Sequence, residues 1–600
     1  MQRFIETQRR VAVDQIRYQP NDECPRVVAF LSALQILLPN SISLVTLVTL
    51  VVLASGESED YLQWVVIMAL AVTGLSMIVH ALRFQRFGSG RLIVANFNVP
   101  FLAVSALALQ IGGPSLLASL IVVSTLLQLV LTLRLASLRR IFTPAVTGTV
   151  IMLVAVSAVP FIVSVTVVPP EETPLVLFLA PGLVALSIGV LVSLLGTPLI
   201  RMWVLPITIA AGLAVAIPLG LYDVAGVAAA PWLVFPDLDR VDLGFSFSAE
   251  FWALLPVFAI VNLTGFMKSV GDLSVIYGAS YREPVALDFR VVQGGLNVTG
   301  ASTFVCGLLG IPPVAAPWSA TASYIGIIGV SAASVGVFLG LMTIAVALLS
   351  KLLAALIAVP GPVVSAVYVI IFGMLFIEGA RMAFGNGFDR KQALAIGVPL
   401  VMGLSAGSFG SLIQGDASYV FGNPIVMGAA TALGIAIFVE LSNVRNRPIR
   451  VDLARSSLPA VDEYLSRFAD RYRWAEDAKN RLRLVGEETL LILLDQEDHQ
   501  TSGEESNGNV RRLTATVHRD QGSAEVEFVV VSDDVGEGNL ENRLAFLTDE
   551  FVLEDDEREI SMRVLRHSAS SVKHRKYHGI DVISCRVESG PAKSPVQAGI

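Results

Sequence analysis

Apolar stretches long enough to cross a membrane recur through the first 442 residues of this 600-residue chain. A run of about 18 or more apolar residues is typical of a transmembrane helix. The uninterrupted stretches are residues 29–53, 62–82, 114–133, 146–167, 175–197, 250–267, 353–377, 393–413 and 424–442. Weaker stretches, broken by Gly, Pro, Asn or Ser, are residues 91–105, 203–221, 290–310, 312–330 and 331–350. The sequence therefore predicts an all-α polytopic membrane protein with about fourteen spans.

The charged residues divide the chain into two parts of different composition. Only 15% of all residues are charged, whereas roughly 25% are charged in an ordinary soluble protein. Of the 42 Lys and Arg and the 50 Asp and Glu, residues 451–600 hold 19 and 29. This distribution excludes an ordinary soluble enzyme for the first part and predicts a soluble, acidic domain for the second. An acidic domain also argues against nucleic acid as a partner.

These patterns predict the domain boundaries. We expect an N-terminal cytoplasmic segment (1–27), a transmembrane domain (28–442), a linker (443–457), a cytoplasmic domain (458–590) and a short tail (591–600).

Loop charges predict the orientation in the membrane. One set of connections is basic, with Arg83, Arg86, Arg91, Arg134, Arg139, Arg140, Arg282, Arg290, Arg381, Arg390 and Lys391. The alternate set is acidic, with Glu57, Glu59, Asp60, Glu171, Glu172, Asp223, Asp237 and Asp239. Because basic loops stay in the cytoplasm, we expect both termini to be cytoplasmic and the protein to lie in a plasma or inner membrane. The polar N-terminus has no apolar h-region and predicts no signal peptide.

Three motif classes are absent from the sequence. The cysteines Cys24, Cys306 and Cys585 are far apart and form no CxxC or Cys/His cluster, so we expect neither a disulfide framework nor a metal site. No P-loop of the form GxxxxGK[ST] occurs, which argues against transport driven directly by ATP.

Two apolar segments are interrupted by polar residues and prolines. Residues 91–100 read RLIVANFNVP, and residues 311–324 read IPPVAAPWSATASY. Non-helical backbone at membrane depth is tolerated only where protein or a water-filled cavity covers it. One such segment is explained by a Pro-kinked, packed helix. Two of them, in the two halves of the chain, indicate a transporter binding site.

An ionisable pair ends the apolar run FWALLPVFAIVNLTG. Lys268 and Asp272 are four residues apart in FMKSVGDL and therefore share one helix face. Ionisable residues within a span usually face the protein interior or a water cavity. The functional interpretation makes Lys268 a substrate contact and Asp272 a cation- or proton-coupling carboxylate. The alternative is a local ion pair, or a lysine that extends to the headgroups.

With these residues the chain resembles the nucleobase–ascorbate transporter family over about residues 15–442. Residues 142–160 (FTPAVTGTVIMLVAVSAVP), 350–382 (SKLLAALIAVPGPVVSAVYVIIFGMLFIEGARM) and 388–407 (FDRKQALAIGVPLVMGLSAG) are similar to blocks of that family in the same order. The resemblance implies two inverted seven-span repeats, divided into a core and a gate domain, and short strands that flank a nucleobase. It also implies a secondary transporter rather than an enzyme, coupled to a proton or sodium ion without a cofactor, and commonly a homodimer.

The resemblance also implies site residues. Gln35 falls in the first-span block, and Phe97 in ANFNV is placed as a stacking ring. In the eighth span Lys268 replaces the family's substrate-binding carboxylate, whereas Asp272 keeps an acidic position. The tenth-span match, PWSATASYIGIIGVS, brings Ala322, Ser323 and Tyr324 to the substrate and puts Ser323 where the family has an acidic residue.

These departures suggest which substrate the protein takes. A carboxylate pairs with ring N–H groups, whereas a lysine offers only donors. The sequence therefore favours a nucleobase-like solute that is anionic or rich in acceptors, such as urate or xanthine. The alternative is a membrane sensor that binds its ligand without transporting it and signals through the C-terminal domain.

The C-terminal domain reads as an α+β sandwich. Two helices are expected over 459–497, strands over 511–520, 524–534 and 579–588, and a helix over 557–572. The order is similar to the ATP-binding domain of histidine kinases and anti-sigma-factor kinases, which implies nucleotide contacts at Glu488, Asp534, Gly536 and Gly538. That family's second glycine box is replaced by EREISM, so we expect a regulatory module that binds a partner protein rather than a kinase.

Overall fold

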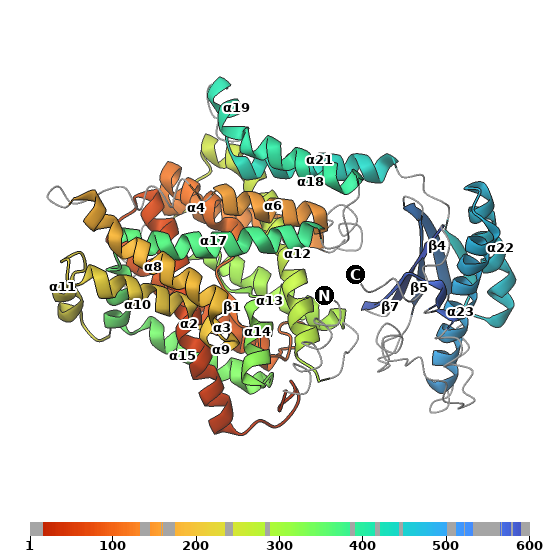
Figure 1. Cartoon of the computed structure of the whole chain (residues 1–600), viewed down its shortest axis with the longest axis horizontal. Helices are drawn as coiled ribbons and strands as arrows, with labels where there is room; N and C mark the ends of the chain where they lie inside the picture. Colours follow the sequence, from red (N-terminus) through yellow and green to blue (C-terminus); the bar gives the residue numbers. More distant parts are fainter. Residues whose placement is uncertain are drawn as a thin grey trace. The chain divides into compact units, whose positions relative to one another are not determined.

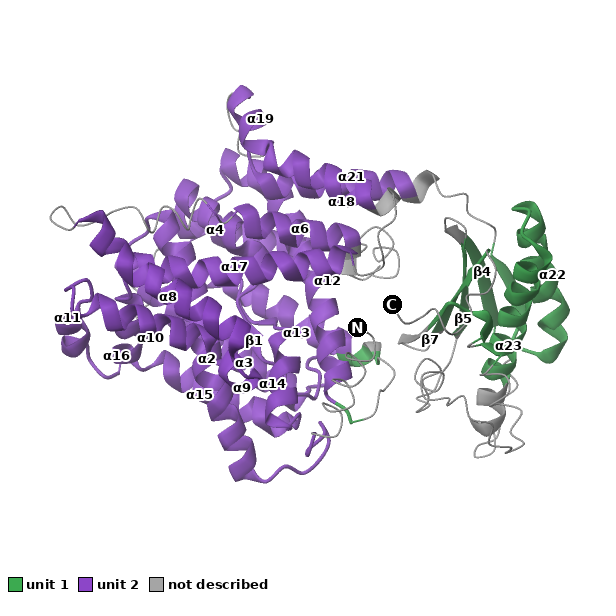
Figure 2. Ribbon diagram, viewed as in Figure 1, with its two compact units in different colours: residues 1–15, 281–291, 443–600 green, residues 16–280, 292–442 purple. Residues whose placement is uncertain are grey.

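A computed structural model of the chain describes residues 16–132, 144–157, 159, 174–233, 244–282, 288–384, 390–413, 421–442, 448–500, 512–520, 523–531, 564–565, 567–577 and 580–589. The chain divides into two compact units (Figure 2). Residues 16–280 and 292–442 form the first unit, called here the membrane body. The second unit contains the C-terminal domain.

The membrane body is built almost entirely of helices (Figure 1). In its first half these are α2 (Arg26–Ser55), α3 (Glu59–Leu82), η1 (Val99–Phe101), α4 (Leu102–Thr132), α6 (Pro144–Ser157), α8 (Leu175–Leu195), α9 (Pro198–Met202), α10 (Val204–Ala216) and α11 (Val224–Ala229). In its second half they are α12 (Ala249–Ala279), α13 (Phe289–Leu308), α14 (Ala320–Ile328), α15 (Ala333–Ala347), α16 (Ser350–Ile357), α17 (Gly361–Phe384), α18 (Arg390–Leu404), α19 (Ala406–Leu412) and α21 (Pro424–Ser442). The only strands described within this unit are β1 (Ala95–Asn96) and β2 (Ala316–Pro317).

Large apolar side chains remain exposed on several of these helices, as expected for a surface that lies against lipid. On α8 the side chains of Leu183, Leu191, Leu194 and Leu195 are 51% to 77% exposed. An apolar face of this extent is not stable in water. It fits a helix whose outer side meets hydrocarbon, where every backbone polar group is satisfied within the helix itself.

The described residues contain six helices that are long and apolar enough to cross a membrane. There are eight such spans if each of two bent helix pairs counts as one. The multi-pass membrane fold is therefore confirmed, while the count of about fourteen stays a prediction. Continuous helices undercount spans where the chain is broken. In α4 the backbone leaves helical geometry at Gly112 and Gly113, and Gly113 has a φ of 64°, which glycine adopts without strain. The pairs α15–α16 and α18–α19 bend by 77° and 48°.

The helices of the membrane body pack in two groups. One group contains α2, α3, α4, α12 and α15; the other contains α6, α8, α10, α17, α18 and α21. Each group has a close crossing of glycines. A Cβ on Gly74 of α3 would lie 2.6 Å from the Gly340 oxygen of α15, and one on Gly148 of α6 would lie 2.5 Å from the Gly379 oxygen of α17. Small residues let helix backbones approach closely in membranes.

The C-terminal domain is a five-stranded antiparallel sheet with two helices on one side (Figure 1). The strand order is β3 (Ile449–Asp452), β4 (Arg512–Asp520), β5 (Ser523–Val531), β7 (Ile580–Glu588) and β6 (Ser571–Tyr577). The short η3 (Arg455–Ser457) leads into α22 (Leu458–Arg471) and α23 (Glu476–Gln500). Alternate strand residues such as Leu513, Ala515 and Val517 are buried and form one core with Leu465 and Leu482 of the helices. The expected α+β sandwich is therefore present.

Two details differ from the sequence prediction. Residues 443–457 were expected to be a linker, but Ile449–Asp452 forms the edge strand β3 and pairs with β4, Ile449 lying opposite Ala515. The helix expected over 557–572 does not reach its end, because β6 begins at Ser571 and pairs with β7. In both places the hydrogen bonds of the sheet override the local pattern.

Candidate functional site

The two interrupted segments of the sequence meet in the structure. Strands β1 and β2 pair antiparallel, with Ala95 opposite Pro317 and Asn96 opposite Ala316. Backbone bonds extend the contact on both sides, from Trp318 N to the Val94 oxygen over 3.0 Å and from Asn98 N to the Pro313 oxygen over 3.1 Å. The broken backbone of each segment is thus satisfied by the other, which explains how non-helical chain is tolerated inside the membrane body.

Two buried asparagines hold β1 against α2. Asn40 of α2 donates from Nδ2 to the Ala95 oxygen over 3.2 Å. Asn96 donates from Nδ2 to Asn40 Oδ1 over 2.9 Å and accepts at Oδ1 from the Phe97 N–H over 2.6 Å. Both asparagines are almost fully buried. A network in which each buried amide finds a partner fixes the backbone where a helix is interrupted.

Thr321 ties the start of α14 to the chain just before β1. Its Oγ1 accepts from the Val94 N–H over 3.1 Å and lies 2.6 Å from the Trp318 oxygen. The hydroxyl is fully buried. Residues 94–98 and 317–321 are therefore joined into one hydrogen-bonded unit, which restricts the orientation of their side chains.

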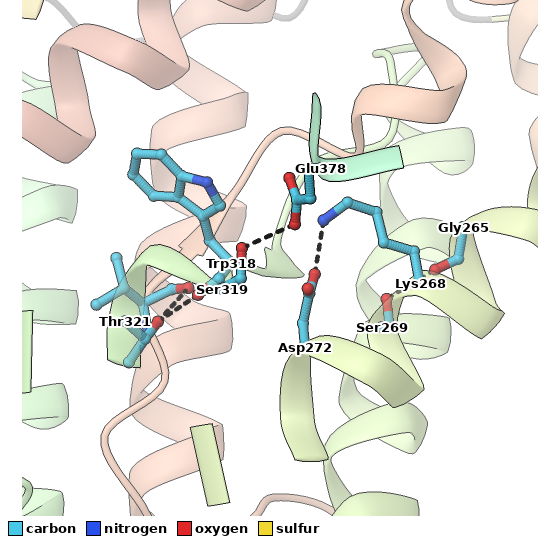
Figure 3. Close-up of polar contacts among 9 residues, drawn as sticks. Gly265, Lys268, Ser269, Asp272, Trp318, Ser319, Thr321 and Glu378 are labelled. Atoms are coloured by element: carbon cyan, nitrogen blue, oxygen red, sulfur yellow. Dashed lines mark hydrogen bonds and ion pairs between the residues drawn. The ribbon is translucent and has the colours of Figure 1, made fainter. Parts of the chain in front are cut away.

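Lys268 and Asp272 form a buried ion pair on α12 (Figure 3). The Lys268 Nζ donates to Asp272 Oδ2 over 2.6 Å, and the two side chains are 11% and 8% exposed. The spacing of four residues places them one helical turn apart on the same face. Since the lysine is buried, it does not extend to the headgroups; the local ion pair is formed, and it lies inside the membrane body.

A third charged side chain faces this pair from another helix. Glu378 of α17 points toward the Lys268 ammonium in Figure 3. Its Oε1 accepts a hydrogen bond from the Ser319 Oγ over 3.1 Å. Ser319 lies directly between β2 and α14. The glutamate therefore joins α17 to the interrupted segment and to the ion pair of α12.

The interrupted segment around β1 also reaches α12 close to the ion pair. A Cβ on Gly265 would lie 3.0 Å from Asn98 Oδ1, so the glycine leaves room for the asparagine side chain. Ser269, one turn later, donates from Oγ to the Gly265 oxygen over 2.9 Å (Figure 3). One face of α12 thus carries, in sequence, the Asn98 contact and the Lys268–Asp272 pair.

The residues predicted for the site lie in different environments. Phe97 and Tyr324 are 3% and 5% exposed, and the Tyr324 ring packs edge-on against Trp318 with centroids 6.1 Å apart. Ala322 is half-buried. Gln35 and Ser323 are exposed, so the structure does not bury either of them with Lys268 and Asp272.

Glu378, Ser319 and Asn40 form part of this arrangement and were not predicted from the sequence. A signal existed for Glu378, since an acidic residue inside the apolar run IIFGMLFIEGA is rare unless it faces a polar interior. Ser319 lies one helical turn before Ser323, which the resemblance favoured. Asn40 follows Pro39 in α2, a position where a proline interrupts helical hydrogen bonding.

The residues proposed to contact nucleotide lie in the C-terminal domain. Glu488 is on α23, and its Oε2 is buried without a hydrogen-bond partner among the residues that the structure describes. Asp534, Gly536 and Gly538 lie outside the described residues. Within the described ranges of the whole chain, no group of three or more His, Cys, Asp or Glu side chains is arranged to hold a metal ion.

Comparison with known proteins shows that the chain is similar to permeases. A model of the xanthine/uracil permease family, described as a permease family, matches residues 28–409. The chain is 25% identical to xanthine permease XanP of Escherichia coli K12 over 407 residues, 64% of this chain and 86% of that protein. It is 24% identical to xanthine permease XanQ of the same organism over 408 residues, 64% and 85% of the two chains. A uracil permease of Bacillus caldolyticus is 26% identical over 273 residues, 44% and 61% of the two chains.

Solved structures give weaker similarities. Murine Slc26a9, an anion transporter, is 12% identical with a TM-score of 0.47, and the match covers 75% of this chain and 74% of that chain. The transmembrane domain of the cyanobacterial bicarbonate transporter BicA is 14% identical with a TM-score of 0.40, covering 69% and 96%.

Proposed function

Because the chain belongs to the nucleobase–ascorbate transporter family, whose members are permeases and not enzymes, we propose that it is a secondary transporter of a xanthine-like nucleobase driven by an ion gradient. The matched relatives named as xanthine permeases support the substrate class. The chemistry of the Lys268–Asp272 pair is the second support.

The observation that carries the proposal is the buried ion pair beside the paired strands. Lys268 and Asp272 share a hydrogen bond at the place where two interrupted segments meet α12. An ammonium donates to ring carbonyls, and a carboxylate accepts from ring N–H groups. A neutral base such as xanthine carries both kinds of group. The hydrogen-bonded backbone of residues 94–98 and 317–321 provides a frame for such a ligand, and we assign the ring of Phe97, buried beside it, as the stacking partner.

We assign ion coupling to Asp272. The carboxylate of Asp272 loses its hydrogen bond from the buried ammonium when a substrate takes the lysine's hydrogen bonds. A proton or a sodium ion then compensates the charge that is left. Coupling of this kind links substrate binding to ion binding through one residue and requires no cofactor.

The arrangement in the membrane follows from the same proposal. The two helix groups correspond to a core and a gate domain, built from two inverted seven-span repeats, and the protein forms a homodimer. Both termini face the cytoplasm of a plasma or inner membrane because the basic loops alternate with the acidic ones.

We propose that the C-terminal domain regulates transport by binding a partner protein. Its sheet and two helices form a complete core, and it lies beyond residue 409, where the family match ends. Nucleotide binding at Glu488, Asp534, Gly536 and Gly538 is a separate, testable part of this proposal. Protection of the full chain from thermal unfolding by a nucleotide, lost in Glu488→Gln, would support it.

Uptake by proteoliposomes tests the transport proposal. The purified protein is reconstituted and offered radiolabelled xanthine, uracil or urate, with an imposed proton or sodium gradient. We expect accumulation of xanthine that requires one of the gradients. Lys268→Gln should abolish it, whereas the matched control Lys351→Gln, whose Nζ lies 4.6 Å from the Trp232 ring centroid, should retain it.

Three outcomes of this experiment separate the alternatives. Accumulation of urate but not of xanthine would show that the substrate is an anionic base, as Lys268 considered alone suggests. Binding without accumulation would support the sensor function. Absence of both binding and uptake for all three bases would overturn the proposal.

A further inference from the structure

The charged side chains around α12 do not balance. Lys268 contributes one ammonium, and Asp272 accepts its hydrogen bond over 2.6 Å. Glu378 brings a second carboxylate that points at the same ammonium (Figure 3). When both acids are ionised, the cluster has one more negative than positive charge.

The hydrogen bonds of Glu378 leave acceptor capacity unused. A carboxylate offers about four lone-pair sites. Within the described part of the chain, Glu378 accepts one hydrogen bond, from the Ser319 hydroxyl over 3.1 Å. Its residue is only partly buried, so a ligand has access to the remaining sites.

The position of Glu378 is fixed by packing. Gly379, its neighbour, lies so close to α6 that an added Cβ would be 2.8 Å from the Gly148 oxygen. Because this crossing sets the height and rotation of α17, the glutamate is held toward α12. Ser319 then orients the carboxylate from the opposite side.

Glu378 also comes from a different helix group than the ion pair. Lys268 and Asp272 lie on α12 of the first group, whereas α17 packs with α6, α8 and α10 in the second. The charged cluster therefore needs both groups to be complete. A ligand bound there contacts both at once.

We infer that Glu378 is a substrate-binding residue, one that accepts ring N–H groups and makes the site select neutral, N–H-donating bases over anionic ones. This inference rests on the transport function proposed above and specifies the substrate class. It gives the acceptor role to α17, since the position in α14 where the resemblance expects an acid holds the exposed Ser323.

The physical reason for the selectivity is electrostatic. The carboxylate of Glu378 is stabilised by N–H donors and repels an anion in the same place, because water screens the repulsion less in this partly buried site than in bulk. This repulsion remains when a coupling ion compensates the charge of Asp272. Specificity arises as much from the penalty on the wrong ligand as from contacts with the right one. Lys268 carries one positive charge, which balances only one of the two carboxylates and therefore does not remove this repulsion.

Ligand-dependent thermal stabilisation of the purified protein tests the inference. Xanthine and urate are titrated near neutral pH, where xanthine is mostly neutral and urate is an anion. Wild type should prefer xanthine. Glu378→Gln keeps the shape and removes the charge; we expect xanthine affinity to fall by about tenfold or more and the xanthine-to-urate preference to fall with it.

Three further variants make the result specific. Glu378→Asp keeps the charge and should keep the preference, which also covers the case in which Glu378→Gln fails to fold. Ser319→Ala removes the orienting donor; xanthine affinity should fall by about threefold to tenfold while the preference for the neutral base remains. Glu250→Gln, at the first turn of α12, is the matched control and should leave both affinities unchanged.

The outcomes distinguish this inference from the transport function. If wild type binds xanthine and Glu378→Gln binds both bases with unchanged affinities, the role of Glu378 is refuted and the transport function stands. If wild type prefers urate, the electrostatic argument is refuted in the same way. If wild type binds no base, the proposed function fails and this inference fails with it.

Discussion

Lys268 Nζ and Asp272 Oδ2 lie 2.6 Å apart on consecutive turns of α12, with about nine-tenths of each side chain buried. Taking two such charges out of water costs several kcal/mol for each ion, which their attraction offsets only when both are present. Removing one partner of this ion pair should therefore destabilise the protein more than removing both. Substitutions of Lys268 and Asp272 test this dependence without any ligand.

Replacing Lys268 by methionine leaves the carboxylate of Asp272 buried without its ammonium. We expect the free energy of unfolding in mixed micelles to fall by about 3 kcal/mol, as for other broken buried pairs. Lys268→Met/Asp272→Asn removes both charges and should recover most of that loss. Additive losses in the double variant would show that the two side chains do not interact.

The asparagine network predicts a structural cost of its own. Asn40→Ala removes the donor to the Ala95 oxygen and leaves the Asn96 amide with only its 3.5 Å hydrogen bond to the backbone oxygen of residue 40, and we expect a loss of about 2 kcal/mol in the free energy of unfolding. Asn297 is a matched control because its amide donates to the Arg86 oxygen over 2.8 Å outside the network. Equal losses in Asn40→Ala and Asn297→Ala would argue against a special role for the network.

The crossing of α3 and α15 depends on two glycines. A Cβ on Gly340 would lie 2.4 Å from the Gly74 oxygen, closer than packed atoms approach. Gly340→Ala should therefore lower the free energy of unfolding by about 1–3 kcal/mol, which is measured as a lower thermal midpoint. Gly373→Ala of α17 adds a carbon that meets no neighbouring segment within 4 Å and should be neutral or stabilising, because alanine favours the helix. An unchanged thermal midpoint in Gly340→Ala would mean that α3 and α15 can move apart at little energetic cost.

Hydropathy and chain breaks predicted much of this architecture. The apolar runs predicted the membrane helices. The polar residues and prolines at 91–100 and 311–324 indicated the two interrupted segments, which contain the paired strands β1 and β2. The spacing of Lys268 and Asp272 predicted a shared helix face, which the ion pair confirms. These features depend on local pattern and helical period, both of which are visible in one sequence.

Contacts between distant segments could not be predicted in this way. Glu378 is 106 residues from Asp272, and only the packing of α17 brings them together. The hydrogen bond from Ser319 to this glutamate likewise joins two distant segments, and no local pattern indicates it. Strand β3 was also missed, since four residues of a polar connection become a strand only when β4 supplies its hydrogen bonds.

Cys585 in the C-terminal domain gives a pH-dependent prediction. Burial raises the pKa of its thiol from 9.0 to about 12, although the Thr489 hydroxyl, 3.6 Å from Sγ, favours the thiolate. In the unfolded chain the thiol loses its proton near the ordinary value. The folded domain therefore binds more protons between about pH 9 and pH 12, and its stability falls as the pH rises through that interval.

Thiol labelling of the intact protein checks this prediction. At about pH 8 a maleimide should modify the half-buried Cys24 while Cys585 stays unmodified, because the thiolate is the reactive species and Cys585 holds almost none. Peptide mass spectrometry gives the two rates separately. Raising the pH toward 11 should accelerate modification of Cys585 more steeply than that of Cys24, since destabilisation of the fold adds to ionisation of the thiol. Modification of Cys585 at the rate of Cys24 already at pH 8 would contradict a buried, protonated thiol at this position.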